Sequence, residues 1–300
     1  MFTIAIHAGA GSVKRAHTSP EQEKEYHSGL QKCLQAGYQV LASGGSALDA
    51  VEQAVIALEN DPLFNAGKGS VFTSEGTHEM DAAIMCGKTL KAGAVSAVTN
   101  VRNPIILARK IMQESESVLL TAKGAMRFAD LHGLKFEANT YFDTDHRYEE
   151  QLEAKKVEDR RNTDKDTVGA VAVDVFGNVA VATSTGGLTN KKFSRVGDSP
   201  IIGGGTYANN DTCAVSCTGD GEFFIRLVSA YDVSCLMEYK GLTLQQACQV
   251  VIKDKLSSLG GEGGLIAVDR SGNTELVFNC ESMLRGWQNH LEEATTAIWV

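Results

Sequence analysis

Apolar side chains recur along the first half of the chain at the spacings of strands and helices. Residues 2–7 alternate in the manner of a strand and run into the glycine-rich sequence AGAG. Residues 21–43 carry apolar side chains at helical spacing, and Ser46 can cap a second helix over 47–59. The same patterns predict strands at 81–86, 92–98 and 118–121 and helices at 103–114 and 122–131.

The second half begins with a hairpin signal. Two alternating runs, VGAVAVDV and NVAVATS, are joined by a Phe-Gly-Asn turn at 176–178. Further along, the sequence predicts a strand at 212–217, helices at 222–239 and 244–256, and a second hairpin formed by 264–269 and 274–278. Because strands cluster and then helices cluster, twice, the order favours stacked layers of sheet and helix, an α+β fold, over an alternating βαβ fold.

Between the two halves lies a charged segment, residues 142–166. Fifteen of its residues are Asp, Glu, Lys or Arg, so the segment can bury little apolar surface. We predict a flexible linker there, which ends abruptly at Thr167.

Composition and charge exclude several classes of protein. The net charge of -9 argues against a nucleic-acid partner, since phosphate binding requires a basic surface. The N-terminal sequence lacks the pattern of a signal peptide and no run of about 18 apolar residues occurs, so we expect a cytoplasmic protein without a membrane span. The seven cysteines include no CxxC pair, and we expect reduced thiols, with neither a disulfide framework nor a zinc site.

Thr167 is the first candidate for chemistry. It stands at the start of a predicted buried strand, directly after the linker. If the Asp166–Thr167 bond breaks, the freed α-amine, which titrates near ~8, can act as the base for the threonine hydroxyl. A hydroxyl without such a neighbour is a weak nucleophile. The ordinary interpretation is a threonine that merely begins a strand, because threonine favours strands.

Three later segments strengthen the catalytic interpretation. The hydroxyl-rich residues 183–185 can face Thr167 across the hairpin. Arg195 and Asp198 share one short loop, and such a pair can bind a free α-carboxylate and a free α-amine together. At 218–222 a strand turns into a helix, where a hydroxyl and amide groups can hold an oxyanion. Taken singly, each has an ordinary explanation: a polar strand end, a surface ion pair or a tight turn.

Together these segments resemble the plant-type L-asparaginases and isoaspartyl peptidases, which are N-terminal-nucleophile (Ntn) hydrolases. The resemblance covers nearly the whole chain, and the occurrence of all the motifs in this order makes it very specific. The matching motifs are IHAGAG at 6–11, ALENDPLFNAGKGSVF at 57–72, MDAAIM at 80–85, TVGAVAVD at 167–174, ATSTGG at 182–187, RVGDSP at 195–200, YANN at 207–210, SCTGDGE at 216–222 and GGEGGLIAVD at 260–269.

The resemblance implies a role for each matched residue. Thr167 would be the nucleophile, and the Asp166–Thr167 bond would be the site of self-cleavage. His7 receives no catalytic role. The other implied residues are Thr185, which would orient the nucleophile; Asn65, a helper near it; Thr218 and Gly219, the oxyanion hole; Gly221, in the substrate pocket; Arg195 and Asp198, which would bind the substrate α-carboxylate and α-amine; and Gly9 and Gly11, in a loop that would assist cleavage.

The resemblance also implies a fold, an assembly and a reaction. The fold would be a four-layer αββα sandwich, a single domain whose α chain (1–166) and β chain (167–300) pair into a dimer of heterodimers. The substrates would be small molecules: L-asparagine, hydrolysed to aspartate and ammonia, and β-aspartyl (isoaspartyl) dipeptides, hydrolysed to aspartate and an amino acid. No catalytic cofactor is expected. A structural sodium ion would bind the backbone carbonyls of Leu58, Glu59, Asp61, Phe64, Ala66 and Lys68, since oxygen ligands suit a hard cation.

Asp166 departs from the pattern, since close members have glycine before the nucleophile. Aspartate there resembles the lysosomal glycosylasparaginases, so one alternative is a glycosylasparaginase-like hydrolase, although this chain lacks the secretion signal and disulfides of that branch. A carboxylate beside the scissile bond could supply a base or repel the oxyanion, and the sequence leaves both open. The other alternative is an uncleaved, inactive relative acting as a binding protein, against which the intact set of candidate residues argues.

Overall fold

A computed structural model of the chain describes residues 1–156 and 166–300. In these ranges one sheet has eight strands, in the order β12-β11-β1-β5-β6-β2-β3-β4, and another has four, in the order β10-β9-β8-β7. The strands are β1 (Thr3–Ala10), β2 (Met80–Cys86), β3 (Ala92–Val98), β4 (Leu119–Thr121), β5 (Val168–Val173), β6 (Val179–Thr185), β7 (Thr206–Ala208), β8 (Cys213–Gly219), β9 (Gly263–Asp269), β10 (Thr274–Phe278), β11 (Ser282–Asn289) and β12 (Thr295–Trp299).

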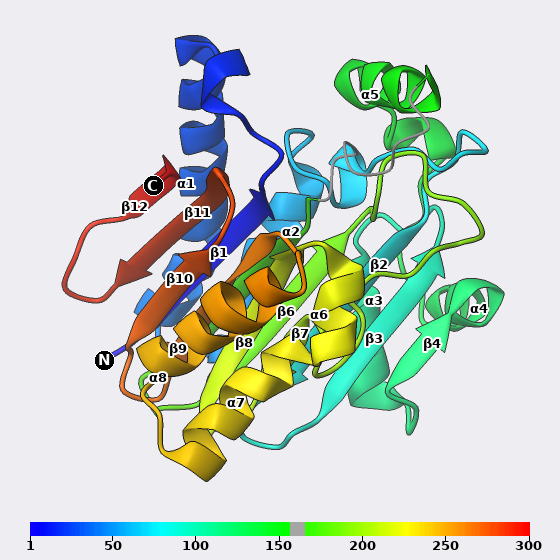
Figure 1. The fold of residues 1–300 in the computed structure, drawn as a ribbon. Helices are drawn as coiled ribbons and strands as arrows, with labels where there is room; N and C mark the ends of the chain where they lie inside the picture. The colour runs from blue at the N-terminus through cyan, green and yellow to red at the C-terminus, as the bar shows by residue number, and fades with distance from the viewer. Residues whose placement is uncertain (157–165) are drawn as a thin grey trace.

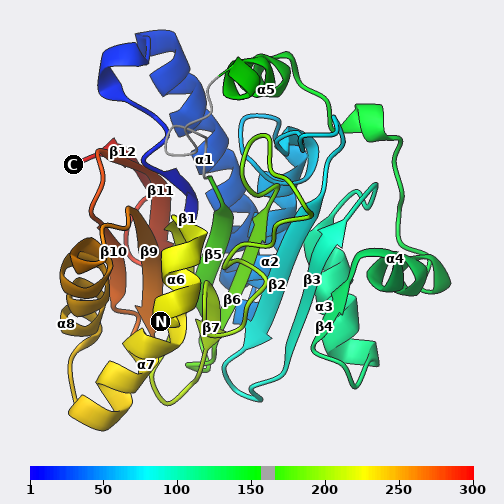
Figure 2. The same ribbon diagram turned by 45° about the vertical axis from the view of Figure 1, so that its right-hand side comes forward.

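The helices lie on the outer sides of the two sheets, except α5, which lies beyond the ends of the strands at the top of the view (Figures 1 and 2). They are α1 (Pro20–Ala42), α2 (Ala47–Asn60), α3 (Pro104–Glu114), α4 (Ala122–Leu131), α5 (Asp145–Lys156), α6 (Gly221–Leu227), α7 (Ser229–Lys240) and α8 (Leu244–Gln249), which continues as a π-helical segment, Val250–Leu256. Short 3-10 turns occur at Arg15–His17, Gly67–Gly69 and Asn139–Tyr141. Among the described residues, no helix is both long and apolar enough to cross a membrane.

Three apolar clusters hold the layers together. One lies between the large sheet and helices α1–α4, and a second lies between the small sheet and α6–α8. The third lies between the sheets, where Val171 and Val181 of the large sheet pack in one cluster with Ile266 and Val268 of the small one. Strand β5 is therefore buried on both faces, and its continuous apolar sequence VGAVAV is typical of such a strand.

Most elements match the sequence patterns. Ser46 caps α2 by accepting a hydrogen bond from the backbone of Asp49, and the two predicted hairpins form as β5–β6 and β9–β10. Strands β7, β11 and β12 were not predicted. All seven cysteines are free thiols, as expected, and four of them are buried.

One helix differs from its prediction. The single helix expected at 222–239 is broken at Val228, which adopts a left-handed φ of 52°. The break lets α7 begin against a neighbouring turn, because Ala230 and Tyr231 donate their backbone N–H groups to the carbonyls of Gly204 and Gly203.

The charged segment also differs from its prediction as a flexible linker over 142–166. Residues 145–156 form helix α5, while 157–165 lie outside the described residues. Its inner face is polar: Arg147 donates Nε to the Gly69 carbonyl at 2.9 Å, and Gln151 donates to the Thr73 carbonyl at 2.5 Å. Hydrogen bonds to backbone carbonyls therefore dock this helix where an apolar stripe would usually do so.

Candidate active site

Thr167 lies at the start of β5, in the middle of the large sheet. Strand β5 pairs with β6 so that Val168 is opposite Ser184, and this register brings Thr185 beside Thr167. Thr167 is 5% exposed, and its Oγ1 lies 3.4 Å from Thr185 Oγ1 and 3.4 Å from Ser199 Oγ. Both hydrogen bonds are long, which is common in catalytic sites without substrate.

Two side chains hold the carbonyl that precedes Thr167. The carbonyl oxygen of Asp166 accepts hydrogen bonds from Asn65 Nδ2 at 2.9 Å and from Thr185 Oγ1 at 3.0 Å. Asn65 is itself fixed, since it also donates to the Gly187 carbonyl at 2.8 Å and accepts from Val71 N at 3.0 Å. Two oriented donors on one carbonyl oxygen are the arrangement that stabilises a negative charge developing there.

His7 holds the other side of Thr167. Burial lowers the pKa of His7 to about 3, so the ring is neutral at ordinary pH. Its Nδ1 lies 2.9 Å from the carbonyl oxygen of Thr167 and must donate to it, so Nε2 accepts from Ser216 Oγ at 2.8 Å. His7 thus fixes the backbone of Thr167, and in the described part of the chain its ring nitrogens bond the Thr167 carbonyl and Ser216 and not the Thr167 hydroxyl.

Arg195 and Asp198 lie together, as their spacing suggested, but Arg195 already has a partner. Its Nε and Nη2 donate to the two carboxylate oxygens of Glu222 at 2.8 and 2.8 Å, in the forked geometry that arginine uses for carboxylates. A Cβ at Gly221 would lie 2.7 Å from Asp198 Oδ1 and 2.8 Å from Arg195 Nη2, so only glycine leaves this space open.

Asp198 and Thr218 each have a buried polar atom without a hydrogen-bond partner in the described part of the chain: Asp198 Oδ2 and Thr218 Oγ1. Burial raises the pKa of Asp198 to about 7, and the charge of Arg195 opposes that rise. Leaving a buried polar group unpaired costs about 1–3 kcal/mol, so a ligand that pairs with these two atoms would recover that free energy. Next to Thr218, Gly219 adopts a φ of 135°, a conformation that favours glycine.

The six residues expected to hold sodium span the last turn of α2 and the loop that follows it. Two of their carbonyl oxygens lie close against glycines of this loop: a Cβ at Gly67 would collide with the carbonyl oxygen of Glu59, and one at Gly69 with that of Phe64. The carbonyls of Leu58, Asp61, Phe64 and Ala66 each accept a backbone hydrogen bond from within the loop. Within residues 1–156 and 166–300, no group of three or more His, Cys, Asp or Glu residues could hold a metal ion. The loop therefore offers backbone oxygens, the donor type that a hard cation accepts.

Sequence reasoning missed several residues that contact the site. Ser199, Glu222 and Ser216 lie inside matched motifs but had no role, and a hydroxyl or carboxylate next to a predicted site residue is the signal that could have marked them. Ser12 and Arg147 could not be found in this way, because they approach Asp166 from segments far away in the sequence.

These features define a class of protein. The threonine at the head of a central, doubly buried strand, the donors on the preceding carbonyl and the mixed α/β architecture are those of the Ntn hydrolases. The comparisons agree, since the model of a family described as asparaginase matches residues 1–298. The chain belongs to this family.

Similar proteins cover almost the entire chain. The isoaspartyl peptidase of Salmonella typhimurium is 51% identical over 306 residues, covering 99% of this chain and 98% of its own length. The isoaspartyl peptidase of Escherichia coli is 50% identical, covering 99% of this chain and 95% of its own length. The human isoaspartyl peptidase/L-asparaginase is 43% identical over 286 residues, covering 93% of this chain and 91% of its own length.

Proposed function

We propose that this chain cleaves itself between Asp166 and Thr167 and then hydrolyses L-asparagine and β-aspartyl dipeptides with Thr167 as the nucleophile. The observation that carries the proposal is the environment of this one peptide bond: its carbonyl oxygen is held by Asn65 and Thr185, and the Thr167 hydroxyl lies beside Thr185. The relatives named above are isoaspartyl peptidases and L-asparaginases, which favours these substrates over glycosylasparagines and over an inactive binding protein.

Self-cleavage would proceed by an N-to-O acyl shift. The Thr167 hydroxyl adds to the Asp166 carbonyl carbon, and the oxyanion is held by Asn65 and Thr185. The C–N bond then breaks, the hydroxyl proton passes to the departing nitrogen, and an ester remains. One water molecule hydrolyses this ester, which leaves a carboxylate on Asp166 and a free amine and hydroxyl on Thr167.

Turnover would use the freed amine of Thr167 as the base for its own hydroxyl. The hydroxyl attacks the side-chain carbonyl of the aspartyl substrate, and Thr218 and Gly219 hold the oxyanion; the unpaired hydroxyl of Thr218 supports this role. Ammonia or an amino acid leaves with a proton, and water releases aspartate. Arg195 would bind the α-carboxylate in place of Glu222, while Asp198 would bind the α-amine.

We also propose the finer architecture that the family resemblance implies. The three separate apolar clusters support a four-layer αββα sandwich, in which residues 1–166 and 167–300 remain one domain after cleavage. A sodium ion bound by backbone carbonyls of residues 58–68 would stiffen the segment that carries Asn65, and oxygen ligands suit such a hard cation. A dimer of αβ heterodimers is the assembly to test by light scattering.

The deciding experiment is an intact mass spectrum of the purified protein combined with an assay of both substrates. We expect fragments of roughly 18 and 14 kDa, the 32.1 kDa chain divided in proportion to 166 and 134 of its 300 residues, with the smaller one starting at Thr167. Thr167→Ala should remain one chain without activity, whereas Thr167→Ser keeps a hydroxyl and should still cleave. Turnover by the uncut Thr167→Ala protein would remove Thr167 as the nucleophile.

A further inference from the structure

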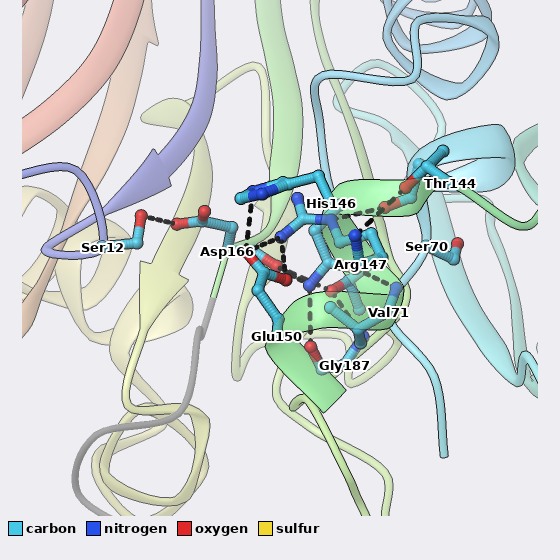
Figure 3. Close-up of polar contacts among 12 residues, drawn as sticks. Ser12, Ser70, Val71, Thr144, His146, Arg147, Glu150, Asp166 and Gly187 are labelled. Carbon is cyan, nitrogen blue, oxygen red and sulfur yellow. Dashed lines mark hydrogen bonds and ion pairs between the residues drawn. The ribbon is translucent and has the colours of Figure 1, made fainter. Parts of the chain in front are cut away.

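The side chain of Asp166 is buried beside the Asp166–Thr167 bond, between Ser12 and Arg147 (Figure 3), and we call its surroundings the Asp166 pocket. We propose, building on the self-cleavage described above, that Gly9, Ser12 and Arg147 form this pocket and that it positions the scissile peptide for cleavage. Asp166 thereby acts as an anchor for the end of the α chain. Glycine, the residue that the sequence resemblance leads one to expect here, could not be held in this way.

Gly9, near the end of strand β1, and Ser12, just after that strand, form one side of the pocket. Ser12 Oγ donates to Asp166 Oδ1 at 2.5 Å, a length typical of a hydroxyl bound to an ionised carboxylate. Gly9 adopts a φ of 118°, and a Cβ added to it would collide with Oδ1 and Cγ of Asp166. The carboxyl group therefore lies directly against the Gly9 backbone, in the space that a side chain at position 9 would take.

Helix α5 forms the opposite side. Arg147 is only 2% exposed, and it is held by the Gly69 carbonyl and by Glu150, with Nη1–carboxylate distances of 3.1 and 2.9 Å. Glu150 also pairs with His146 at 2.8 Å. The charges that face Asp166 are thus those of Arg147, Glu150 and His146: burial raises the pKa of Asp166 to about 6, while Arg147, Ser12 and His146 lower it and Glu150 raises it.

The pocket completes the fixation of the scissile peptide. Ser12 holds the Asp166 side chain, Asn65 and Thr185 hold its carbonyl oxygen, and His7 holds the next carbonyl, that of Thr167. With its side chain anchored, residue 166 cannot rotate its carbonyl away from the two donors. The hydrogen bonds of the Thr167 hydroxyl go to Thr185 and Ser199, so the carboxyl group orients the peptide without acting as the base.

The test is the rate of self-cleavage of freshly synthesised chains, followed by intact mass. Ser12→Ala should slow cleavage by about tenfold, the effect of losing one hydrogen bond to a charged group. In an Asp166→Gly background the same substitution should change nothing, because there is no carboxyl group left to hold. Turnover per cleaved site should be unchanged in Ser12→Ala. Ser258→Ala is the matched control, since that hydroxyl donates only to the Lys255 carbonyl, at 2.8 Å.

A second pair of variants tests the Gly9 contact. Gly9 and Gly11 both have positive φ, 118° and 88°, so alanine is strained at either position. Only the Cβ at position 9 meets Asp166, whereas that at position 11 lies 3.5 Å from Cys280. Gly9→Ala should therefore slow cleavage more than Gly11→Ala, and Asp166→Gly should relieve the excess. Equal slowing by both variants, or no relief, would overturn the pocket.

The anchor can also be measured without cleavage. In the uncleavable Thr167→Ala chain, Ser12→Ala and Arg147→Gln should each raise the pKa of Asp166, read from its carboxyl carbon by NMR, because each removes a group that lowers it. An unchanged pKa in both variants, or an effect of Ser12→Ala on cleavage that persists in the Asp166→Gly background, would refute the anchor alone. A wild-type chain that is never cut would instead refute the proposed self-cleavage and, with it, the positioning role.

Discussion

The groups that hold the Asp166–Thr167 peptide and the groups expected to bind substrate differ in the hydrogen-bond partners that the chain gives them. On the side of Asp166, the scissile carbonyl has two donors, the carboxyl group has Ser12, and Arg147 is bound by a carbonyl and a carboxylate. On the side of Thr218, a buried hydroxyl and a buried carboxylate oxygen have no partner among the described residues. One side contains the reactant of the proposed self-cleavage, whereas the other leaves polar groups with which the proposed substrate could pair.

This difference would separate the two proposed reactions, which share Thr167 as the nucleophile. Self-cleavage is unimolecular, so every group that holds the peptide is in place as soon as the chain folds. Substrate hydrolysis requires the site to bind an amino acid with a free carboxylate and a free amine, and unpaired polar groups supply that affinity. Substitutions on the two sides should therefore have separable effects, one on maturation and the other on turnover.

Of the substitutions compared between the two sides, Asn65→Ala should have the largest effect, which is a slower rate of self-cleavage. It removes one of the two donors on the scissile carbonyl oxygen, and loss of a comparable oxyanion donor costs about 10²–10³ in rate. The rate of appearance of the smaller fragment by intact mass measures it, with a melting curve to show that the fold persists. Cleavage at the wild-type rate would mean that Thr185 alone holds this oxygen.

Arg195→Ala should weaken substrate binding and leave self-cleavage unchanged. We expect KM for L-asparagine to rise by about 10–100-fold, the value of a bidentate contact to a carboxylate, while self-cleavage proceeds normally. Arg226→Ala is the control, because that arginine is exposed and lies over the Phe223 ring. An unchanged KM in Arg195→Ala would rule out the proposed substrate pose, and a block in cleavage would show that the two sides are not separable.

Asp198 should make substrate capture depend on pH. Its carboxyl group must be ionised to bind an ammonium group, and burial raises its pKa to about 7, so kcat/KM should fall as the pH drops through about 7. The freed amine of Thr167, near ~8, adds a second ascending limb. Asp198→Asn should lower kcat/KM and abolish the limb near 7 while keeping the other. Persistence of both limbs in the variant would assign the lower one to another group.

How far the sequence could predict the molecule depends on what holds each part. Strands such as β5 and helices such as α2 are held by apolar burial with a regular period, so their patterns predicted them within a few residues. Helix α5 is docked by Arg147 and Gln151 on backbone carbonyls, and the break at Val228 is set by the Gly203–Gly204 turn. Neither cause is visible in local hydrophobicity.

In the candidate site, likewise, contacts within one local unit were predictable and contacts between separate elements were not. The register of a hairpin predicts that Thr185 faces Thr167, because both belong to one local unit. That Ser12 meets Asp166 across 154 positions, and that Glu222 occupies the Arg195 fork, depend on the packing of separate elements. The motif SCTGDGE contained Glu222, yet only the geometry shows that it fills the place expected for the substrate carboxylate.

Glu222 supplies the test with the smallest expected effect, because its carboxylate pairs with Arg195, the residue proposed to bind the substrate carboxylate. Its side chain is 57% exposed, and exposed ion pairs contribute only about 0–1 kcal/mol. A substrate carboxylate that must displace it should bind up to about fivefold more tightly in Glu222→Ala, so KM should fall with little change in kcat. Glu222→Asp, which keeps the charge on a shorter side chain, is the control and should fall between the two. If KM rises in Glu222→Ala, Glu222 holds Arg195 in its binding orientation, and the substrate side is more nearly complete than its unpaired atoms suggest.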